Sequence, residues 1–181
     1  MFRSLWIALS ALVLGGCSSL AVDSDHDESA NFSSYKTFAF ISDSPLLMAK
    51  TVPISPLFEG RVMNATRAEL TNKGYEFIED REAADFVVSF TLGAREKIQI
   101  NNYPASYRGP GGWPWGAPYY TEVDVRDYLE GTLAIDIFDV QNKSPVWHGR
   151  AVKTISAKDR RDPTSTTNTV VAAILDQFPP E

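Results

Sequence analysis

The pattern that most constrains the fold is a period-two alternation of apolar and polar residues over 86–100. Successive side chains of a β-strand point to opposite faces of its sheet, so this pattern predicts one long strand with a single buried face. Gly93 lies within the segment and is expected to mark a bend or a bulge. One face holds Phe86, Val88, Phe90, Leu92, Ala94, Ile98 and Ile100, and the other holds Val87, Ser89, Thr91, Arg95, Lys97 and Gln99.

Two later segments, 123–137 and 146–156, alternate in the same way, and a polar turn at 141–144 separates them. Because hairpin-like connections join antiparallel strands, the three long strands are expected to form a meander. A stretch containing Ser, Pro and Asp over 42–55 is expected to be a loop. Shorter strands are expected over 20–25, 37–41 and 75–78.

Two segments have helical spacing. The first begins at a capping Ser55 followed by Pro56 and ends at Lys73–Gly74, and the second begins at Asp162–Pro163 and stops at Pro179. Together the elements predict an α+β domain, with an antiparallel, mostly meander sheet of about five or six strands and two helices packed on one face. The apolar faces of the helices are expected at Phe58, Val62, Thr66 and Leu70, and at Val170 or Val171, Ile174 and Phe178.

The N-terminus has the layout of a secretory signal peptide, since Arg3 precedes an uncharged apolar stretch over 5–14. That stretch is about half of the roughly 20 residues that a transmembrane helix needs. It ends in Leu14-Gly15-Gly16-Cys17, which resembles the lipobox of bacterial lipoproteins. This resemblance implies a cleaved signal peptide over 1–16 and a lipidated Cys17 with a short tether over 17–19. The predicted strands and helices then make up a single α+β domain over 20–181.

Ser18, rather than Asp, follows the cysteine, which resembles lipoproteins of the outer membrane. The expected location is therefore the periplasmic face of the outer membrane. If residues 18–30 form no strand, the tether extends to residue 30. After cleavage the chain would keep 16 basic and 23 acidic residues, so acyl chains rather than charge are expected to hold it at the membrane.

Residues 101–120 interrupt the strand pattern, because eight of these twenty residues are Gly or Pro. Trp and Tyr are typical anchors at interfaces, so the aromatic residues of this segment form a candidate binding loop. The alternative is a long hairpin loop that folds over a sheet face and covers the core. The candidates are Tyr103, Tyr107, Trp113, Trp115, Tyr119 and Tyr120.

The sequence suggests no catalytic residue, no metal site and no cofactor. One Cys and two His argue against thiolate or multi-histidine metal centres, and a net charge of −6 argues against a nucleic-acid partner. The acidic stretch 23–28 lacks the Gly and Glu of a calcium-binding EF-hand loop. His148 is expected to face away from Trp147, with no nucleophile elbow nearby. Asp136 is expected to pair across the sheet with Arg95, Lys97, Arg150 or Lys153.

Several short motifs occur together in one order along the chain. They are the lipobox, an Asp-rich first strand, Phe32-Ser33-x-Tyr35-x-Thr37-Phe38, Gly74-Tyr75, Ala84-Asp85-Phe86-Val87-Val88, Trp147-x-Gly149 and Phe178-Pro179-Pro180. The set resembles the domain-of-unknown-function family 4136 of bacterial lipoproteins over nearly the whole mature chain. The resemblance implies a periplasm-facing lipoprotein with an α+β domain. It implies no reaction and no catalytic residues.

We therefore expect a lipid-anchored envelope protein that is not an enzyme and acts as a binding or assembly module through its aromatic loop. Its expected partners are the membrane, through the N-terminal lipid, and an unidentified envelope protein or glycan. One alternative is an envelope enzyme acting on glycans, with the aromatic loop stacking on sugar rings. Another is a homo-oligomer that packs through the same loop.

Overall fold

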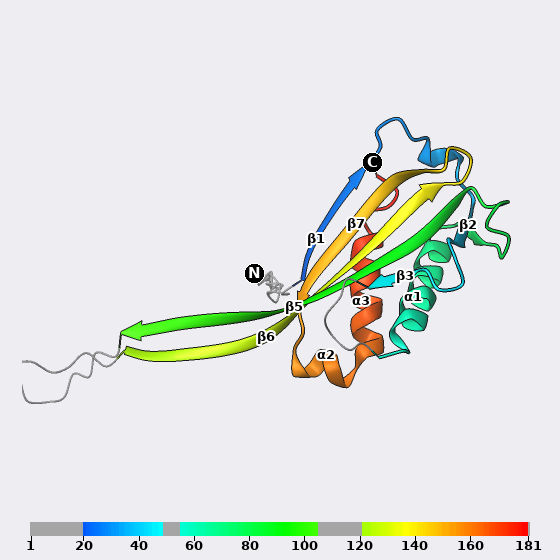
Figure 1. The fold of residues 1–181 in the computed structure, drawn as a ribbon. Coiled ribbons are helices and arrows are strands. Elements are labelled where there is room, and N and C mark those ends of the chain that lie inside the picture. The colour runs from blue at the N-terminus through cyan, green and yellow to red at the C-terminus, as the bar shows by residue number, and fades with distance from the viewer. Residues whose placement is uncertain (1–19, 49–54, 105–120, 181) are drawn as a thin grey trace, which may run out of the picture.

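A computed structural model describes residues 20–48, 55–104 and 121–180, with the backbone alone for 96–104 and 121–128. Seven strands form one mixed sheet in the order β1-β7-β6-β5-β2-β4, with β3 paired to β5 (Figure 1). The strands are β1 (Leu20–His26), β2 (Thr37–Phe40), β3 (Leu46–Met48), β4 (Glu76–Phe77), β5 (Phe86–Pro104), β6 (Thr121–Asp139) and β7 (Ser144–Thr154). The helices are α1 (Phe58–Asn72), α2 (Ala157–Arg161) and α3 (Pro163–Leu175), with a 3₁₀ turn at Phe32–Ser34.

The α+β class is confirmed, but the expectation of a mostly antiparallel sheet of five or six strands is wrong. The meander of β5, β6 and β7 is antiparallel, and β1 adds antiparallel to β7. In contrast, β2 runs parallel to both β4 and β5, and β3 runs parallel to β5. These pairs are parallel because helix α1 follows β2 and β3 in the chain. The helix returns the chain to the end of the sheet where β2 begins, so that β4 and β5 run in the same direction as β2.

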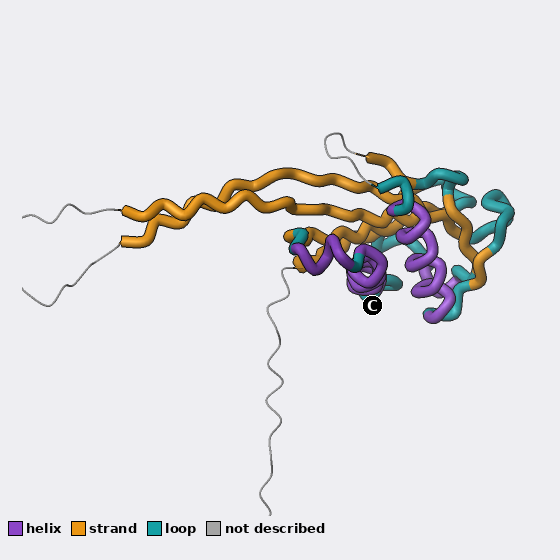
Figure 2. Tube along the Cα trace, turned by 90° about the horizontal axis from the view of Figure 1, so that it is seen from below, coloured by secondary structure: helices purple, strands orange, loops and turns teal. Residues whose placement is uncertain are grey.

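The two long helices α1 and α3 cover the same face of the sheet, as the sequence predicts, and Figure 2 shows them together on one side of the strands. Of the residues predicted for the apolar face of β5, Phe86, Val88, Phe90 and Leu92 are buried and Ala94 is half-buried. The side chains of Ile98 and Ile100 lie outside the described part of the chain. The helices contribute the apolar stripes expected for them. The core combines Phe38, Phe86, Val88, Phe90, Ile135, Ile137 and Trp147 of the sheet with Val62, Leu70, Val171, Ile174, Leu175 and Phe178.

The helix ends differ in how well the sequence predicts them. Asp162 caps α3 as expected, since its carboxylate accepts a hydrogen bond from the Ser165 N–H at 3.0 Å. At the other helix, the Ser55 hydroxyl accepts from the Leu57 N–H in a turn, so that α1 begins at Phe58, later than predicted. Within the described residues, no helix is both long and apolar enough to cross a bilayer.

Gly93 does not mark a bulge. The pairing of β5 with β6 passes through Gly93 and Thr132 without a shift in register. The irregularity lies instead between β6 and β7, at Ile137 and Phe138. We infer that Gly93 is accommodated in the regular ladder.

The carboxylate of Asp85 joins the beginnings of β2 and β5. It accepts hydrogen bonds from the backbone N–H groups of Lys36 and Thr37, both at 2.8 Å, and from the Thr37 hydroxyl at 3.0 Å. Partial burial raises the pKa of Asp85, but these hydrogen bonds to the charged form outweigh it and hold the pKa below its ordinary value. The ionised carboxylate thus holds the parallel pair together.

We predict that Asp85→Asn lowers the free energy of unfolding at neutral pH by about 2 kcal/mol, as expected for hydrogen bonds to a charged acceptor. In the wild type this contribution is complete above the ordinary pKa of 3.8 and is lost as the pH falls through the lower pKa of the folded protein. Urea unfolding at about pH 7 and about pH 2 should therefore show a large difference that shrinks in acid. A difference of equal size at both pH values would contradict this role. Glu28→Gln, at an exposed position, is the matched control.

Candidate functional site

The β5–β6 hairpin extends well beyond the rest of the sheet (Figures 1 and 2). The last residue pair between β6 and β7 is Glu130–Thr154, whereas β5 and β6 remain paired out to Pro104–Thr121. On the other side of β5, the pairing with β3 ends at Leu92. We call the pairs from Glu96–Leu129 to Pro104–Thr121 the distal ribbon. At about 3.3 Å per residue it spans roughly 30 Å.

An ion pair lies where the distal ribbon leaves the domain body. The Arg95 guanidinium contacts the Glu130 carboxylate at 2.6 Å, and these two residues are directly opposite each other on β5 and β6. The Glu130 side chain is only 9% exposed, while that of Arg95 is 65% exposed. The base of the ribbon is therefore fixed by a cross-strand charge pair on the face of the sheet opposite the helices.

In the sequence, the candidate binding loop begins where β5 of this ribbon ends and finishes where β6 begins. The backbone of Tyr103 belongs to β5 and pairs with Glu122 of β6. The other candidates, Tyr107, Trp113, Trp115, Tyr119 and Tyr120, lie outside the described residues, as does Cys17. The ends of the ribbon, at Pro104 and Thr121, are described, and residues 105–120 join them along the chain.

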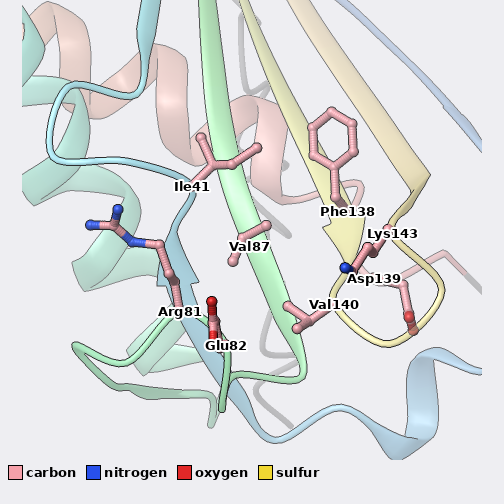
Figure 3. A pocket seen from close by; sticks show the side chains of 8 residues that line it. All are labelled: Ile41, Arg81, Glu82, Val87, Phe138, Asp139, Val140 and Lys143. Carbon is pink, nitrogen blue, oxygen red and sulfur yellow. The ribbon is translucent and has the colours of Figure 1, made fainter.

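A pocket of about 490 Å³ lies on the helix-free face, at the end of the body opposite the distal ribbon (Figure 3). Its floor is apolar, since Val87 of β5 and Phe138 of β6 are direct cross-strand partners. Figure 3 shows Val87 between Glu82 on one side and Phe138 and Lys143 on the other. The complete lining is Ile41, Arg81, Glu82, Val87, Phe138, Asp139, Val140 and Lys143.

Two of the charges around this pocket already have partners. Arg81 forms an ion pair with Asp43 at 2.6 Å. The Asp139 carboxylate accepts hydrogen bonds from the Tyr35 hydroxyl at 2.8 Å and from the Asn142 N–H at 2.6 Å. Burial of Tyr35 and its bond to Asp139 raise the pKa of the phenol, so Tyr35 remains a neutral donor. Arg81 and Asp139 are thus both engaged in contacts within the protein.

Sequence reasoning missed this pocket because it assigned Val87 to a polar face. The sequence does contain a sign of it. Val87 in β5 and Phe138 in β6 are apolar residues at positions where the alternation would place polar ones. Such residues pack together on the helix-free face, where Ala39, Ala84 and Val87 form a small second cluster with Ile78, Phe138 and Val140.

His148 lies on the helix-free face, opposite Trp147, as the alternation predicts. Its Nδ1 contacts the Asp136 carboxylate at 2.6 Å, directly across β6 and β7. Asp136 therefore pairs with His148 and not with Arg95, Arg150 or Lys153, whose partners are Glu130, Asp23 and Asp159. The side chain of Lys97, the fourth expected candidate, lies outside the described residues. His148 and Asp136 thus form a cross-strand pair on the helix-free face, and Ser89 of β5 lies opposite Asp136.

The acidic stretch begins as a strand, as expected for 20–25, and Asp23 and Asp25 are exposed on the same face of β1. Asp23 forms an ion pair with Arg150 at 2.6 Å, and Asp25 lies opposite His148. Among the residues described, no cluster of three or more His, Cys, Asp or Glu side chains is arranged to hold a metal ion.

The fold is similar to several solved structures. A DUF4136 family protein from Bacteroides thetaiotaomicron superposes with a TM-score of 0.58 at 15% identity, covering 90% of this chain and 97% of that one. A PDZ domain protein from Parabacteroides distasonis superposes with a TM-score of 0.53 at 12% identity, covering 90% of this chain and 37% of that one. A PelC dodecamer from Paraburkholderia phytofirmans gives 0.50 at 14% identity, covering 86% and 94%.

At these identities the structural similarity establishes the fold alone. No curated protein matches the chain. The sequence itself matches a family description, a domain of unknown function (DUF4136), over residues 22–180. This range includes every described strand and helix, except for the first two residues of β1. The chain therefore belongs to the DUF4136 family.

Proposed function

We propose that this protein is a lipid-anchored, periplasm-facing lipoprotein of the outer membrane that acts as a non-enzymatic binding or assembly module. In this proposal the aromatic loop is the binding element and the distal ribbon presents it to a partner. The observation that carries the proposal is the length of β5 and β6, which remain paired out to Pro104–Thr121 after their flanking strands have ended.

Physical chemistry supports a partner for this ribbon. An isolated two-stranded ribbon is marginally stable in water, and its two open edges expose unpaired backbone groups that can pair with another chain. Aromatic residues at its end would add contact area at a low cost in side-chain entropy. An envelope protein, a glycan or a second copy of the chain could occupy such a surface.

Self-association has one specific point in its favour. The fold neighbour PelC from Paraburkholderia phytofirmans is a dodecamer, so this type of domain is compatible with assembly into a ring or stack of copies. We include a homo-oligomer among the partners proposed for the distal ribbon. Light scattering of the purified chain distinguishes it from a complex with a different protein.

The proposal is tested by the double substitution Trp113→Ala and Trp115→Ala. We expect it to remove the cross-links that the wild type forms in the native envelope, as identified by mass spectrometry. We also expect the melting temperature to stay within about 2 °C of the wild type, because a surface substitution outside the core changes stability little.

The matched control is Trp113→Phe with Trp115→Phe, which keeps an aromatic surface and should retain most of the cross-links. A large loss of thermal stability in the alanine variant would show that the loop covers the core, and it would remove the recognition role. Turnover of a glycan that disappears on changing one acidic residue would instead favour the enzyme alternative.

A further inference from the structure

The charges of this acidic protein are unevenly distributed between the two ends of the domain body. The net charge of the chain is −6. Helix α2, however, carries Lys158, Arg160 and Arg161 within five residues, all of them exposed. At the other end acidic side chains outnumber basic ones. The acids there include Asp27, Glu28, Glu76, Glu79, Asp80 and Glu82, and the bases are Lys36, Lys73, Arg81 and Lys143.

The cations of α2 are largely uncompensated. The neighbouring Lys153 and Asp159 neutralise each other in an ion pair at 3.1 Å, and Asp159 also completes the capping box of the helix. Among the described side chains, none forms an ion pair with Lys158, Arg160 or Arg161. The remaining acid, Asp162, uses its carboxylate to cap α3. The helix thus presents three positive charges beside one negative charge.

Helix α2 lies at the end of the domain body where β1 begins. Leu20, the first residue of β1, pairs with Lys153 near the end of β7, and α2 begins four residues after Lys153. Figures 1 and 2 both show α2 next to the start of β1. Cys17 is three residues before Leu20, so the covalent geometry of the chain keeps it within roughly 10 Å of β1.

We propose that α2 is a membrane-contact surface that binds the phosphate groups of anionic phospholipids through Lys158, Arg160 and Arg161. The proposal rests on the proposed lipid anchor, because acylation of Cys17 would hold this end of the body against the bilayer. Arg and Lys near an anionic membrane surface attract it within about a Debye length. The acidic end would be repelled, so the contact sets the orientation of the domain on the membrane.

The test uses the mature chain from residue 17 with Cys17→Ser, which is not acylated, and vesicles of phosphatidylcholine with or without phosphatidylglycerol. At about 0.01 M salt we expect sedimentation with the anionic vesicles only, and little at about 0.15 M salt, where screening is much stronger. The triple variant Lys158→Gln, Arg160→Gln and Arg161→Gln should reduce partitioning by roughly 100-fold.

A matched triple variant distinguishes the loss of the α2 surface from a change in the net charge of the protein. Lys36, Lys73 and Lys143 are exposed at the opposite end of the body, and changing all three to Gln removes the same charge. The proposal would be overturned if the two triple variants lost partitioning equally, or if the chain sedimented equally with both kinds of vesicle. Release of the chain by millimolar inorganic phosphate would also overturn it. Circular dichroism confirms that each variant is folded.

The anchor is tested separately, since Cys17→Ala should abolish incorporation of labelled palmitate into the full chain whatever α2 does.

Discussion

Replacing Gly149 with Ala is expected to destabilise the fold by about 3 kcal/mol, at the upper end of the usual cost of overpacking a core. The Trp147 ring lies over this glycine on the helix-covered face of β7. A β-carbon at position 149 would lie 2.1 Å from Cη2 of Trp147 and 2.7 Å from Cγ2 of Ile174. Trp147 is 2% exposed and Ile174 is fully buried, so neither side chain has free space into which it can move.

Differential scanning calorimetry should show a fall in melting temperature of roughly 6–12 °C for Gly149→Ala. Gly60→Ala is the matched control, because a β-carbon there meets nothing within 4 Å and the position is in α1. It should raise stability by about 0.5–1 kcal/mol through helix propensity. Trp147→Phe removes the clashing atom, so the double variant should lose less than the sum of its parts. Additive losses would show that Trp147 does not pack on Gly149.

Phe178→Ala is expected to cost about 3–5 kcal/mol, the usual range for truncating a buried Phe. Phe178 follows α3 and is fully buried. Its ring centroid lies 5.3–5.8 Å from four other aromatic rings, which belong to Phe32, Tyr75, Phe86 and Trp147. This residue therefore connects the chain after α3 to β5, β7 and the turn before β2.

Urea unfolding measures the loss as a fall in the midpoint at an unchanged slope. Leu57→Ala is a suitable control, because Leu57 is 65% exposed and should change stability by less than about 0.5 kcal/mol. A loss below about 1 kcal/mol for Phe178→Ala would mean that the aromatic cluster repacks around the gap.

The period-two pattern predicted the strands of the meander well, because one of their faces is buried against helices. The same pattern says nothing about strand direction, so the parallel pairs of β2 were missed, although a helix between 37–41 and 75–78 pointed to a crossover. Strand β3 was missed since its three residues, Leu46–Met48, are too few to show any period. The short α2 begins at a capping Ser156, a signal that was present and not used.

For the candidate site, the sequence predicts the aromatic loop but not the projection of the distal ribbon. The projection depends on a difference in length: β5 and β6 each have 19 residues, and β7 has 11. An alternating pattern locates each strand but does not show where the neighbouring strands of the sheet end. The outer-face pocket was missed for a related reason, since Val87 and Phe138 become neighbours only through the register of β5 on β6.

The placement of β1 has a consequence for the order of events during biogenesis. Strand β1 pairs with β7 alone, so the first strand of the sheet needs the last one as its partner. A chain that emerges from its N-terminus must keep residues 20–26 unpaired until Ser144–Thr154 has followed. Contacts between distant parts of a sequence form slowly. The edge strand β1 therefore joins the sheet only after the last strand of the meander has been made.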